Sequence, residues 1–336
     1  MEFNTVEEKK RYEKSLRKSL NGVMAASVIQ NLLMIVLTFV VVFFFTLIFL
    51  IQGGFKIGGF EYQDILKLFS LSTTVGIIVN ILIYIVCLFL PFSLYLIIRR
   101  RPVKELMSFK APKASGVVYA LFITLALSVI GEIITVIILS ILNKFGISPK
   151  ELNIEMPSGT LNIILFIIMI AILPAFLEEF AYRGVVLGEA KRYSKSFAIV
   201  FSAFLFSLMH GTAQQIPFAF LVGLSIGYFV IKYNSIWIGI IIHFVNNGLN
   251  IVFQYLSKLF NETDFALIYL AFDVFIVIAG TVALAIYLAL NDFKLKKTDG
   301  ELTFSASLKN MFKSWVFYVF LILTLAILML TFVLKE

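Results

Sequence analysis

The chain has 336 residues, of which 60% are hydrophobic and only 14% are charged, and its formal net charge is +8. These proportions exclude an ordinary soluble domain, because a folded sphere of this size needs a polar exterior. They do not indicate a nucleic-acid-binding protein either, because the basic residues gather in short connections beside apolar segments.

Nine apolar segments follow one another along the chain. A bilayer core about 30 Å thick needs roughly 20 apolar residues per helix, and backbone groups in lipid must be satisfied within helices or a closed barrel. Barrel strands would alternate apolar and polar residues, whereas these segments are continuous, so we predict an all-α polytopic integral membrane protein. The fifth and sixth segments are short, so they either cross the membrane or form a hairpin that stops part-way. We predict about eight to nine transmembrane helices. The nine segments are 22–52, 72–98, 115–142, 161–187, 197–213, 216–231, 235–257, 265–290 and 314–334.

Lysine and arginine residues gather in alternate connections, among them the N-terminal tail and the stretch from Arg99 to Lys113. Positive residues stay on the cytoplasmic side, which predicts that the N-terminus lies inside and the C-terminus outside. The predicted organisation is a cytoplasmic tail over 1–21, transmembrane helices over 22–145, a core over 160–255, a further transmembrane helix over 256–290, a cytoplasmic linker over 291–313 and a C-terminal transmembrane helix over 314–336.

Ionisable residues inside the apolar segments are the functional candidates, because polar groups are costly in lipid. The chain has two histidines, His210 and His243, and both lie inside such segments. The fourth segment carries Glu178 and Glu179, and the seventh carries Asn247. At 1.5 Å per residue, Glu178, the two histidines and Asn247 lie roughly 12–20 Å from the cytoplasmic ends of their segments. We therefore expect these groups to converge at one depth.

Helical spacing separates the two acids. Glu179 precedes Arg183 by four residues, the favourable order for an ion pair on one helix. Glu178 is turned about 100° away and has no basic partner one turn later. His243 and Asn247 are also four residues apart, so both project from one face. The spacing predicts that one acid is neutralised and that the other takes part in chemistry.

These residue types suit peptide hydrolysis. A carboxylate removed from bulk water can act as a general base towards a water molecule near neutrality. A histidine beside it can orient that water and later supply a proton to a leaving amine, while a second histidine and an amide can stabilise a developing oxyanion. Neither a serine elbow nor a Cys–His pair is evident, which favours direct attack by water over an acyl-enzyme.

Three motifs occur in order on separate helices: Glu178–Glu179 with Arg183 (EExxxR), Phe206 with His210 (FxxxH), and His243 with Asn247 (HxxxN). With these motifs, over about 160–255, the chain resembles the CPBP family, which comprises type II CAAX prenyl proteases and bacterial bacteriocin-processing or immunity proteins. The resemblance implies that Glu178 and His210 activate water and that His243 and Asn247 form the oxyanion site. The family has also been described as metalloproteases, so zinc or another divalent metal stays open, although no cofactor is assigned and the absence of HExxH spacing or a sulfur ligand speaks against a structural zinc site.

Several neighbouring residues are expected to support the site. The Glu179–Arg183 pair is interpreted as structural, because paired charges in lipid hold helices together. Tyr182 follows Glu178 by four residues and is predicted to line the pocket. Asn246 and Asn250 are interpreted as packing or supporting groups.

The sequence thus predicts an intramembrane endopeptidase that cleaves a membrane-associated peptide or protein terminus, in CAAX-type processing, bacteriocin maturation or self-immunity. The alternative is a non-enzymatic immunity or scaffold protein, or an ion- or proton-coupled transporter, that uses the same buried groups. The expected partners are the peptide substrate and the lipid bilayer, without nucleic acid, and the oligomeric state is left open. The Phe-, Ile- and Lys-rich composition favours a bacterial cell membrane.

Overall fold

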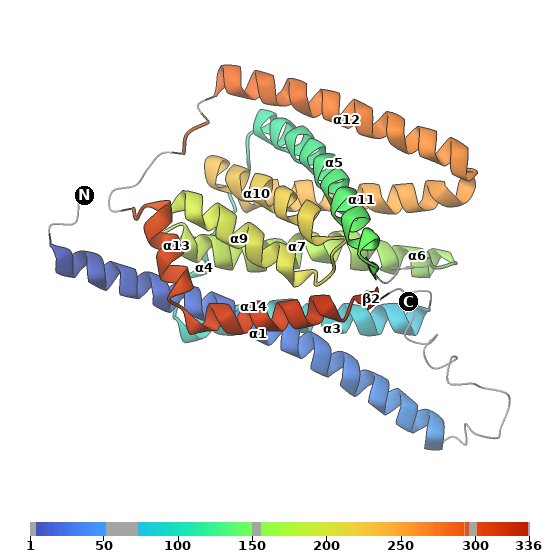
Figure 1. Ribbon diagram of the computed structural model, residues 1–336, viewed down its shortest axis with the longest axis horizontal. Helices are drawn as coiled ribbons and strands as arrows, with labels where there is room; N and C mark the ends of the chain where they lie inside the picture. Colours follow the sequence, from blue (N-terminus) through green and yellow to red (C-terminus); the bar gives the residue numbers. More distant parts are fainter. Residues whose placement is uncertain (1–4, 52–72, 150–155, 292, 296–300, 335–336) are drawn as a thin grey trace.

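The computed structural model describes residues 5–51, 73–149, 156–291, 293–295 and 301–334, and most of these residues are helical (Figure 1). Parts of the predicted 22–145 and 291–313 regions, namely 52–72, 292 and 296–300, lie outside the described residues. The α-helices are α1 (Val6–Ile51), α3 (Thr74–Ile98), α4 (Val103–Leu106), α5 (Ala114–Lys144), α6 (Thr160–Ile167), α7 (Leu173–Glu178), α8 (Leu187–Ala190), α9 (Lys195–Met209), α10 (Ile216–Tyr233), α11 (Ile236–Leu259), α12 (Glu262–Leu290), α13 (Phe304–Phe312) and α14 (Trp315–Met329). Two π-helices, η1 (Ile168–Ile172) and η2 (Glu179–Val186), interrupt the fourth apolar segment, and two strands, β1 (Ile147–Pro149) and β2 (Phe332–Leu334), complete the set.

Seven helices in the described part of the chain are long and apolar enough to cross a membrane. The pair α13 and α14, which is bent by 75°, makes an eighth if it counts as one span. The all-α polytopic membrane architecture is thereby confirmed. Helix α9 has 15 residues and reaches only about 22 Å at 1.5 Å per residue. The described residues therefore contain seven or eight candidate spans, against the eight to nine predicted.

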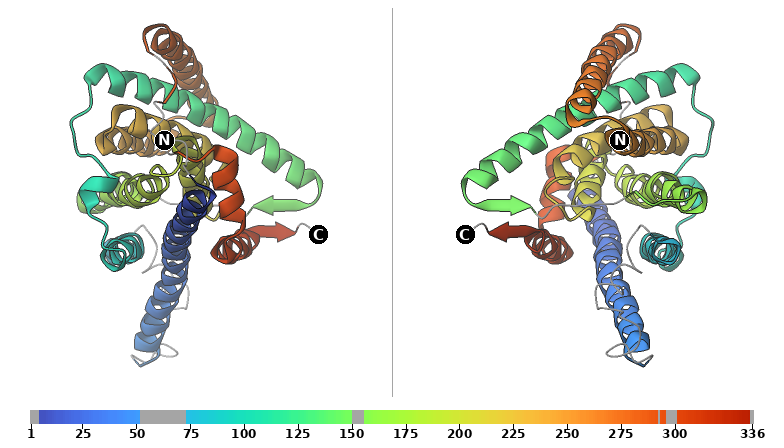
Figure 2. Two further views of the ribbon diagram at one scale, coloured as in Figure 1. Left: turned by 90° about the vertical axis from the view of Figure 1, so that its left-hand side faces the viewer. Right: turned by 90° about the vertical axis from the view of Figure 1, so that its right-hand side faces the viewer.

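The helices pack side by side around one large hydrophobic core and two smaller apolar clusters. Helix α5 crosses the other helices obliquely and lies between α10 and α12 (Figures 1 and 2). Helix α9 packs on the other side of α10, while α1 packs against both α3 and α14. Helix α11 lies against the interrupted segment η1, α7 and η2. This arrangement brings the segment that carries Glu178 into the centre of the molecule.

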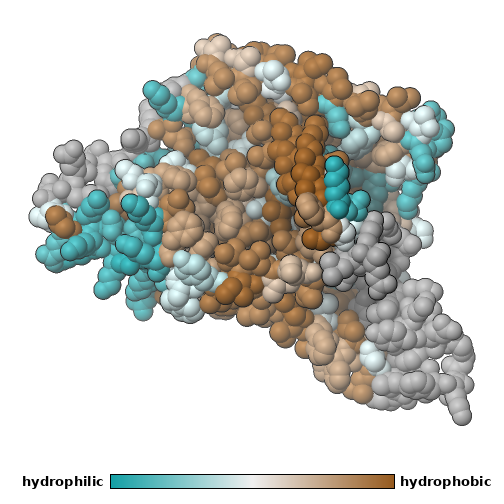
Figure 3. Space-filling view, viewed as in Figure 1, coloured by the Kyte–Doolittle hydropathy of each residue, from teal (hydrophilic) through white to brown (hydrophobic). Residues whose placement is uncertain are grey.

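The outer surface is suited to lipid. Figure 3 shows a broad hydrophobic band across the middle of the molecule, with hydrophilic residues gathered towards its two ends. Large apolar side chains such as Phe39 on α1 and Phe275 on α12 are exposed. The chain is therefore an integral membrane protein.

Helices extend into the segments that were predicted as a tail and as a linker. Residues 6–21, predicted as a tail, form the first part of the continuous helix α1, because Leu16 and Leu20 make an apolar stripe that is fully buried. The region predicted as a linker contains α13, which packs against α1 and α9. The last apolar segment leaves the helix at Met329, and β2 pairs antiparallel with β1 beyond α5.

Candidate active site

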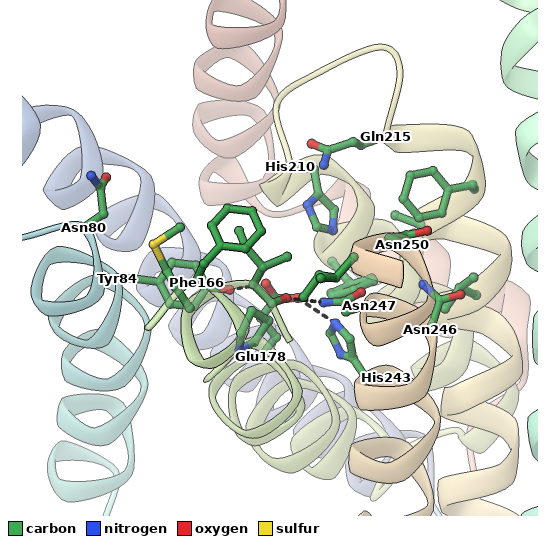
Figure 4. Close-up of a pocket in the computed structure, with 18 of the residues that line it drawn as sticks. Asn80, Tyr84, Phe166, Glu178, His210, Gln215, His243, Asn246, Asn247 and Asn250 are labelled. Atoms are coloured by element: carbon green, nitrogen blue, oxygen red, sulfur yellow. Dashed lines mark hydrogen bonds and ion pairs between the residues drawn. The ribbon is translucent and has the colours of Figure 1, made fainter. Parts of the chain in front are cut away.

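A cavity of about 580 Å³ opens between α1, α3, the interrupted segment, α10 and α11. All four residues predicted to act in catalysis line it: Glu178, His210, His243 and Asn247 (Figure 4). They come from three separate helical segments, so the convergence expected from their depth is present. Figure 4 shows His210 and His243 on one side of the Glu178 carboxylate and Tyr84 on the other.

Glu178 is the last residue of α7 and is only 4% exposed. Its Oε1 accepts a hydrogen bond from the Tyr84 hydroxyl, and its Oε2 lies 3.6 Å from Nε2 of His243. Oε2 has no hydrogen-bond partner among the residues that the structure describes. One oxygen is therefore held by Tyr84, and the other is buried beside His243 without a hydrogen-bond partner among the described residues.

His243 is oriented by the second glutamate. Its Nδ1 lies 2.9 Å from Oε1 of Glu179. An ionised carboxylate only accepts hydrogen bonds, so this contact places a proton on Nδ1 and directs Nε2 towards Glu178. Nε2 of His243 and Oε2 of Glu178 are 3.6 Å apart. At this separation, one water molecule can lie about 2.8 Å from each of the two atoms, which is a hydrogen-bond distance.

The predicted ion pair between Glu179 and Arg183 is present. Arg183 Nη1 lies 3.0 Å from Glu179 Oε1, and both side chains are fully buried. The guanidinium also lies over the ring of Phe206, 4.0 Å from its centroid, a favourable cation–π arrangement. Close packing holds the acid from the other side, because a Cβ added at Gly239 would lie 2.5 Å from Glu179 Oε2. Glu179 is thus held in place, and its contact with Nδ1 orients the His243 ring.

Asn247 is positioned by a proline on the facing segment. In a regular α-helix the amide of residue 174 would donate to the carbonyl of Ile170, but Pro174 has no N–H. The chain forms the π-helix η1 at this point, and the Ile170 carbonyl accepts a hydrogen bond of 3.0 Å from Asn247 Nδ2. Such π-helical turns are frequent at functional sites. The Asn247 amide has a second N–H that this contact does not use.

His210 caps the end of α9 and packs edge-on against Phe206, with ring centroids 5.1 Å apart. It also lines a second cavity, of about 300 Å³, together with Glu178 and Tyr84. Gln30 and Asn31 of α1 supply polar side chains on the far wall of this second cavity. The two cavities therefore meet at Glu178 and His210.

Tyr182 does not line the 580 Å³ cavity, contrary to the prediction. Its hydroxyl donates to Oε1 of Gln30 over 2.8 Å, and its ring packs between Phe92 and Phe206. The prediction assumed α-helical geometry, but η2 begins directly after Glu178. A π-helix pairs residues five apart rather than four, so the side chain four residues after Glu178 points elsewhere.

Tyr84, which sequence reasoning missed, takes the place next to Glu178. It stands four residues after Asn80 on α3, and both side chains line the cavity. This polar pair on one helical face is the same signal that identified His243 and Asn247, and it was the clue available in the sequence.

Replacing Tyr84 by Phe is expected to lower the rate of any reaction that depends on Glu178 by about 10- to 100-fold. A hydrogen bond to a charged group contributes about 1.5–3 kcal/mol, and its loss lets the carboxylate turn. The rate is compared with that of Tyr255→Phe, whose exposed side chain lies on α11. A Tyr84→Phe protein as active as this control would show that the hydroxyl does not position Glu178.

The described residues do not form a metal site of the zinc type. No group of three or more His, Cys, Asp or Glu side chains among them is arranged to hold a metal ion. Glu179 is engaged with Arg183, and His243 faces a carboxylate with each of its ring nitrogens.

Comparison with known proteins agrees with the geometry. Residues 160–249 match the family model described as type II CAAX prenyl endopeptidase Rce1-like. The chain is 25% identical over 165 residues to the membrane-embedded CAAX protease MroQ of Staphylococcus aureus (strain USA300), which covers 47% of this chain and 66% of that protein. No solved structure gives a match. The segment that matches this family model contains Glu178, His210, His243 and Asn247, so all four candidate residues lie in a region similar to type II CAAX prenyl endopeptidases.

Proposed function

We propose that the chain is an intramembrane endopeptidase that hydrolyses a peptide bond in a membrane-associated peptide or protein terminus. The observation that carries this proposal is the facing pair of Glu178 Oε2 and His243 Nε2, 3.6 Å apart in a cavity that His210 and Asn247 also line. A carboxylate with one unsatisfied oxygen, next to hydrogen-bond donors and an enclosed space, has the parts needed to activate water for attack on a carbonyl.

In the proposed first step, Glu178 Oε2 takes a proton from a water molecule, and the water oxygen attacks the peptide carbonyl carbon. His210 orients this water from the neighbouring wall of the cavity, receives the proton from Glu178 and gives it to the leaving amine. The bond to nitrogen then breaks, which yields a carboxylic acid and an amine. No covalent intermediate with the protein is involved.

His243 and Asn247 are proposed to stabilise the oxyanion. Glu178, Glu179 and Arg183 bring two negative charges and one positive charge into a buried cluster, so a proton on His243 would balance the charge, which favours such a cluster in lipid. Its Nε2–H and the second N–H of Asn247 would then be the donors. Glu179 and the Ile170 carbonyl hold these two side chains in advance, so little reorganisation is needed during the reaction.

The two cavities fit an extended peptide that passes over Glu178. The 580 Å³ cavity is lined by apolar residues such as Phe166 and Phe218 and by amides such as Gln254, which suits apolar side chains attached to a hydrogen-bonding backbone. The 300 Å³ cavity takes the other side of the bond. Because the staphylococcal relative is named a CAAX protease, the proposed substrates are CAAX-type termini or peptides that undergo maturation, including bacteriocin processing or self-immunity.

We further propose a bacterial cell membrane as the location, with the N-terminus on the cytoplasmic side, as the distribution of basic residues predicts. A proton relay or transporter would need its polar groups spaced along a path. The convergence of Glu178, His210, His243 and Asn247 on one cavity favours hydrolysis.

The proposal is tested by mass spectrometry of membrane peptides from cells with and without this protein. We expect peptide fragments that share one cleavage site and appear only when the protein is present. Peptide populations that do not differ between the two kinds of cell would contradict the proposed activity.

A further inference from the structure

A second group of polar side chains lies between three apolar helices, outside the residues assigned to hydrolysis. Each helix contributes two polar residues that are four positions apart and therefore share a face. All six side chains line one small cavity of about 30 Å³. The pairs are Ser128 and Glu132 on α5, Asn246 and Asn250 on α11, and Tyr269 and Asp273 on α12.

The polar atoms of this cluster are incompletely satisfied by the protein. The Tyr269 hydroxyl donates to Glu132 Oε2 over 2.9 Å. Ser128 and Asn246 are only 6% and 7% exposed, yet neither has a hydrogen-bond partner anywhere in the described chain, and the same holds for Asp273. Because buried polar groups are nearly always hydrogen-bonded, the buried Ser128 and Asn246 side chains point to a ligand that completes the cluster.

The two acidic side chains of the cluster favour a cation as the ligand. Glu132 and Asp273 both face the cavity, and no Lys, Arg or His side chain lines it. Neither carboxylate has an ion pair within the described residues. Two uncompensated carboxylates between lipid-spanning helices are costly, and one divalent cation would neutralise both.

The size and donor chemistry of the cluster fit calcium. All six side chains carry an oxygen atom, and the two carboxylates can each offer two. Ca²⁺ binds six to eight oxygen ligands at about 2.3–2.6 Å and tolerates irregular geometry. A cavity of about 30 Å³ holds one small ligand. The ring of Phe253 packs against Tyr269 and Phe272, with centroids 4.9 and 4.7 Å apart, and closes the cluster with apolar surface.

We propose that this cluster binds one calcium ion, which ties α5, α11 and α12 together. The site is separate from Glu178 but adjoins the candidate active site, because Asn246 and Asn250 line both cavities. Figure 4 shows these two residues on the side of the larger cavity away from Tyr84. The ion is coordinated by the side-chain carbonyl oxygens of Asn246 and Asn250. It thereby restrains the part of α11 that carries His243 and Asn247.

The test uses the purified full-length protein in detergent, stripped of metal with a chelator. Equilibrium dialysis with calcium chloride is expected to show one saturable Ca²⁺ per chain. The temperature of thermal unfolding should rise by several degrees when calcium is added, because a ligand that binds only the folded state stabilises it. Magnesium at the same concentration should bind more weakly, because it requires a near-ideal octahedron.

Substitutions that keep side-chain size locate the ion. Asp273→Asn and Glu132→Gln are each expected to weaken calcium binding by about tenfold or more, because the charge of the ligands sets the affinity. Glu262→Gln removes an exposed acid from the same helix as Asp273 and should leave binding unchanged. If either acid variant fails to fold, Ser128→Ala removes a neutral ligand and is expected to weaken binding by a smaller factor.

Absence of saturable calcium binding by the unaltered protein would overturn the proposal, and the two carboxyl groups would then share a proton. Calcium binding that all three cluster variants retain at full affinity would also overturn it, because the ion would then lie elsewhere. Neither calcium binding nor the unfolding temperature depends on peptide cleavage. The calcium site and the proposed hydrolase activity are therefore tested independently.

Discussion

Replacing Glu178 by Gln is expected to reduce peptide cleavage by about 10²–10⁴-fold, the range that a positioned general base contributes. The amide keeps the size of the side chain and can still accept the hydrogen bond from Tyr84, so folding is expected to be preserved. What it loses is the negative oxygen that faces His243 across 3.6 Å. Cleavage is measured with purified protein in lipid vesicles on a peptide identified from membranes.

The control for this experiment is Glu262→Gln, which makes the same chemical change at an exposed position of α12. Both variants should insert into membranes and unfold at nearly the same temperature as the unaltered protein. Cleavage by the Glu178→Gln protein at the rate of the control would remove Glu178 as the general base.

Replacing Glu179 by Ala is expected to act mainly on stability, by about 3–5 kcal/mol. The substitution leaves the Arg183 guanidinium fully buried without its ionic partner, and an uncompensated buried charge is strongly destabilising. It also leaves Nδ1 of His243 without its acceptor. The measurement is the yield of folded protein in detergent together with its unfolding temperature.

A double variant, Glu179→Gln with Arg183→Gln, provides the matched comparison. Removing both charges leaves no unpaired ion in the core, so the double variant should regain part of the folded yield. A Glu179→Ala protein that folds normally but cleaves nothing would contradict the structural assignment and place Glu179 in the chemistry itself.

Glu178 and Glu179 are expected to have different roles because adjacent residues on a helix point in different directions. Glu179 faces Arg183, Gly239 and His243, where close packing leaves no room for substrate. Glu178 ends α7 and faces the cavity. The fourth segment thus anchors the site with one carboxylate and presents the other to the reacting molecule.

Much of this organisation could be predicted from the sequence. Continuous apolar segments identify membrane helices because lipid offers backbone groups no other partners. The spacing of Glu179 and Arg183 correctly predicts their ion pair, and the shared depth of Glu178, His210 and His243 correctly predicts that they line one cavity. The shared depth depends only on the rise of a helix, and the ion pair forms although Glu179 and Arg183 both lie in the π-helix η2.

The remaining features depend on departures from α-helical geometry or on contacts between distant segments. Tyr182 was misplaced because η2 changes the number of residues per turn after Glu178. The contact between Asn247 and the Ile170 carbonyl arises because Pro174 removes a donor from the facing segment. Tyr84 reaches Glu178 across 94 positions of the chain, and a single sequence does not reveal such a pairing.

The proposed activation of water by Glu178 is best examined in an experimental structure of the protein in lipid, at a resolution that shows ordered water. We expect a water molecule within about 3.2 Å of both Glu178 Oε2 and His243 Nε2, inside the cavity that His210 and Asn247 line. A Glu178 carboxylate turned away from both histidines, with no water beside it, would show that Glu178 does not activate water.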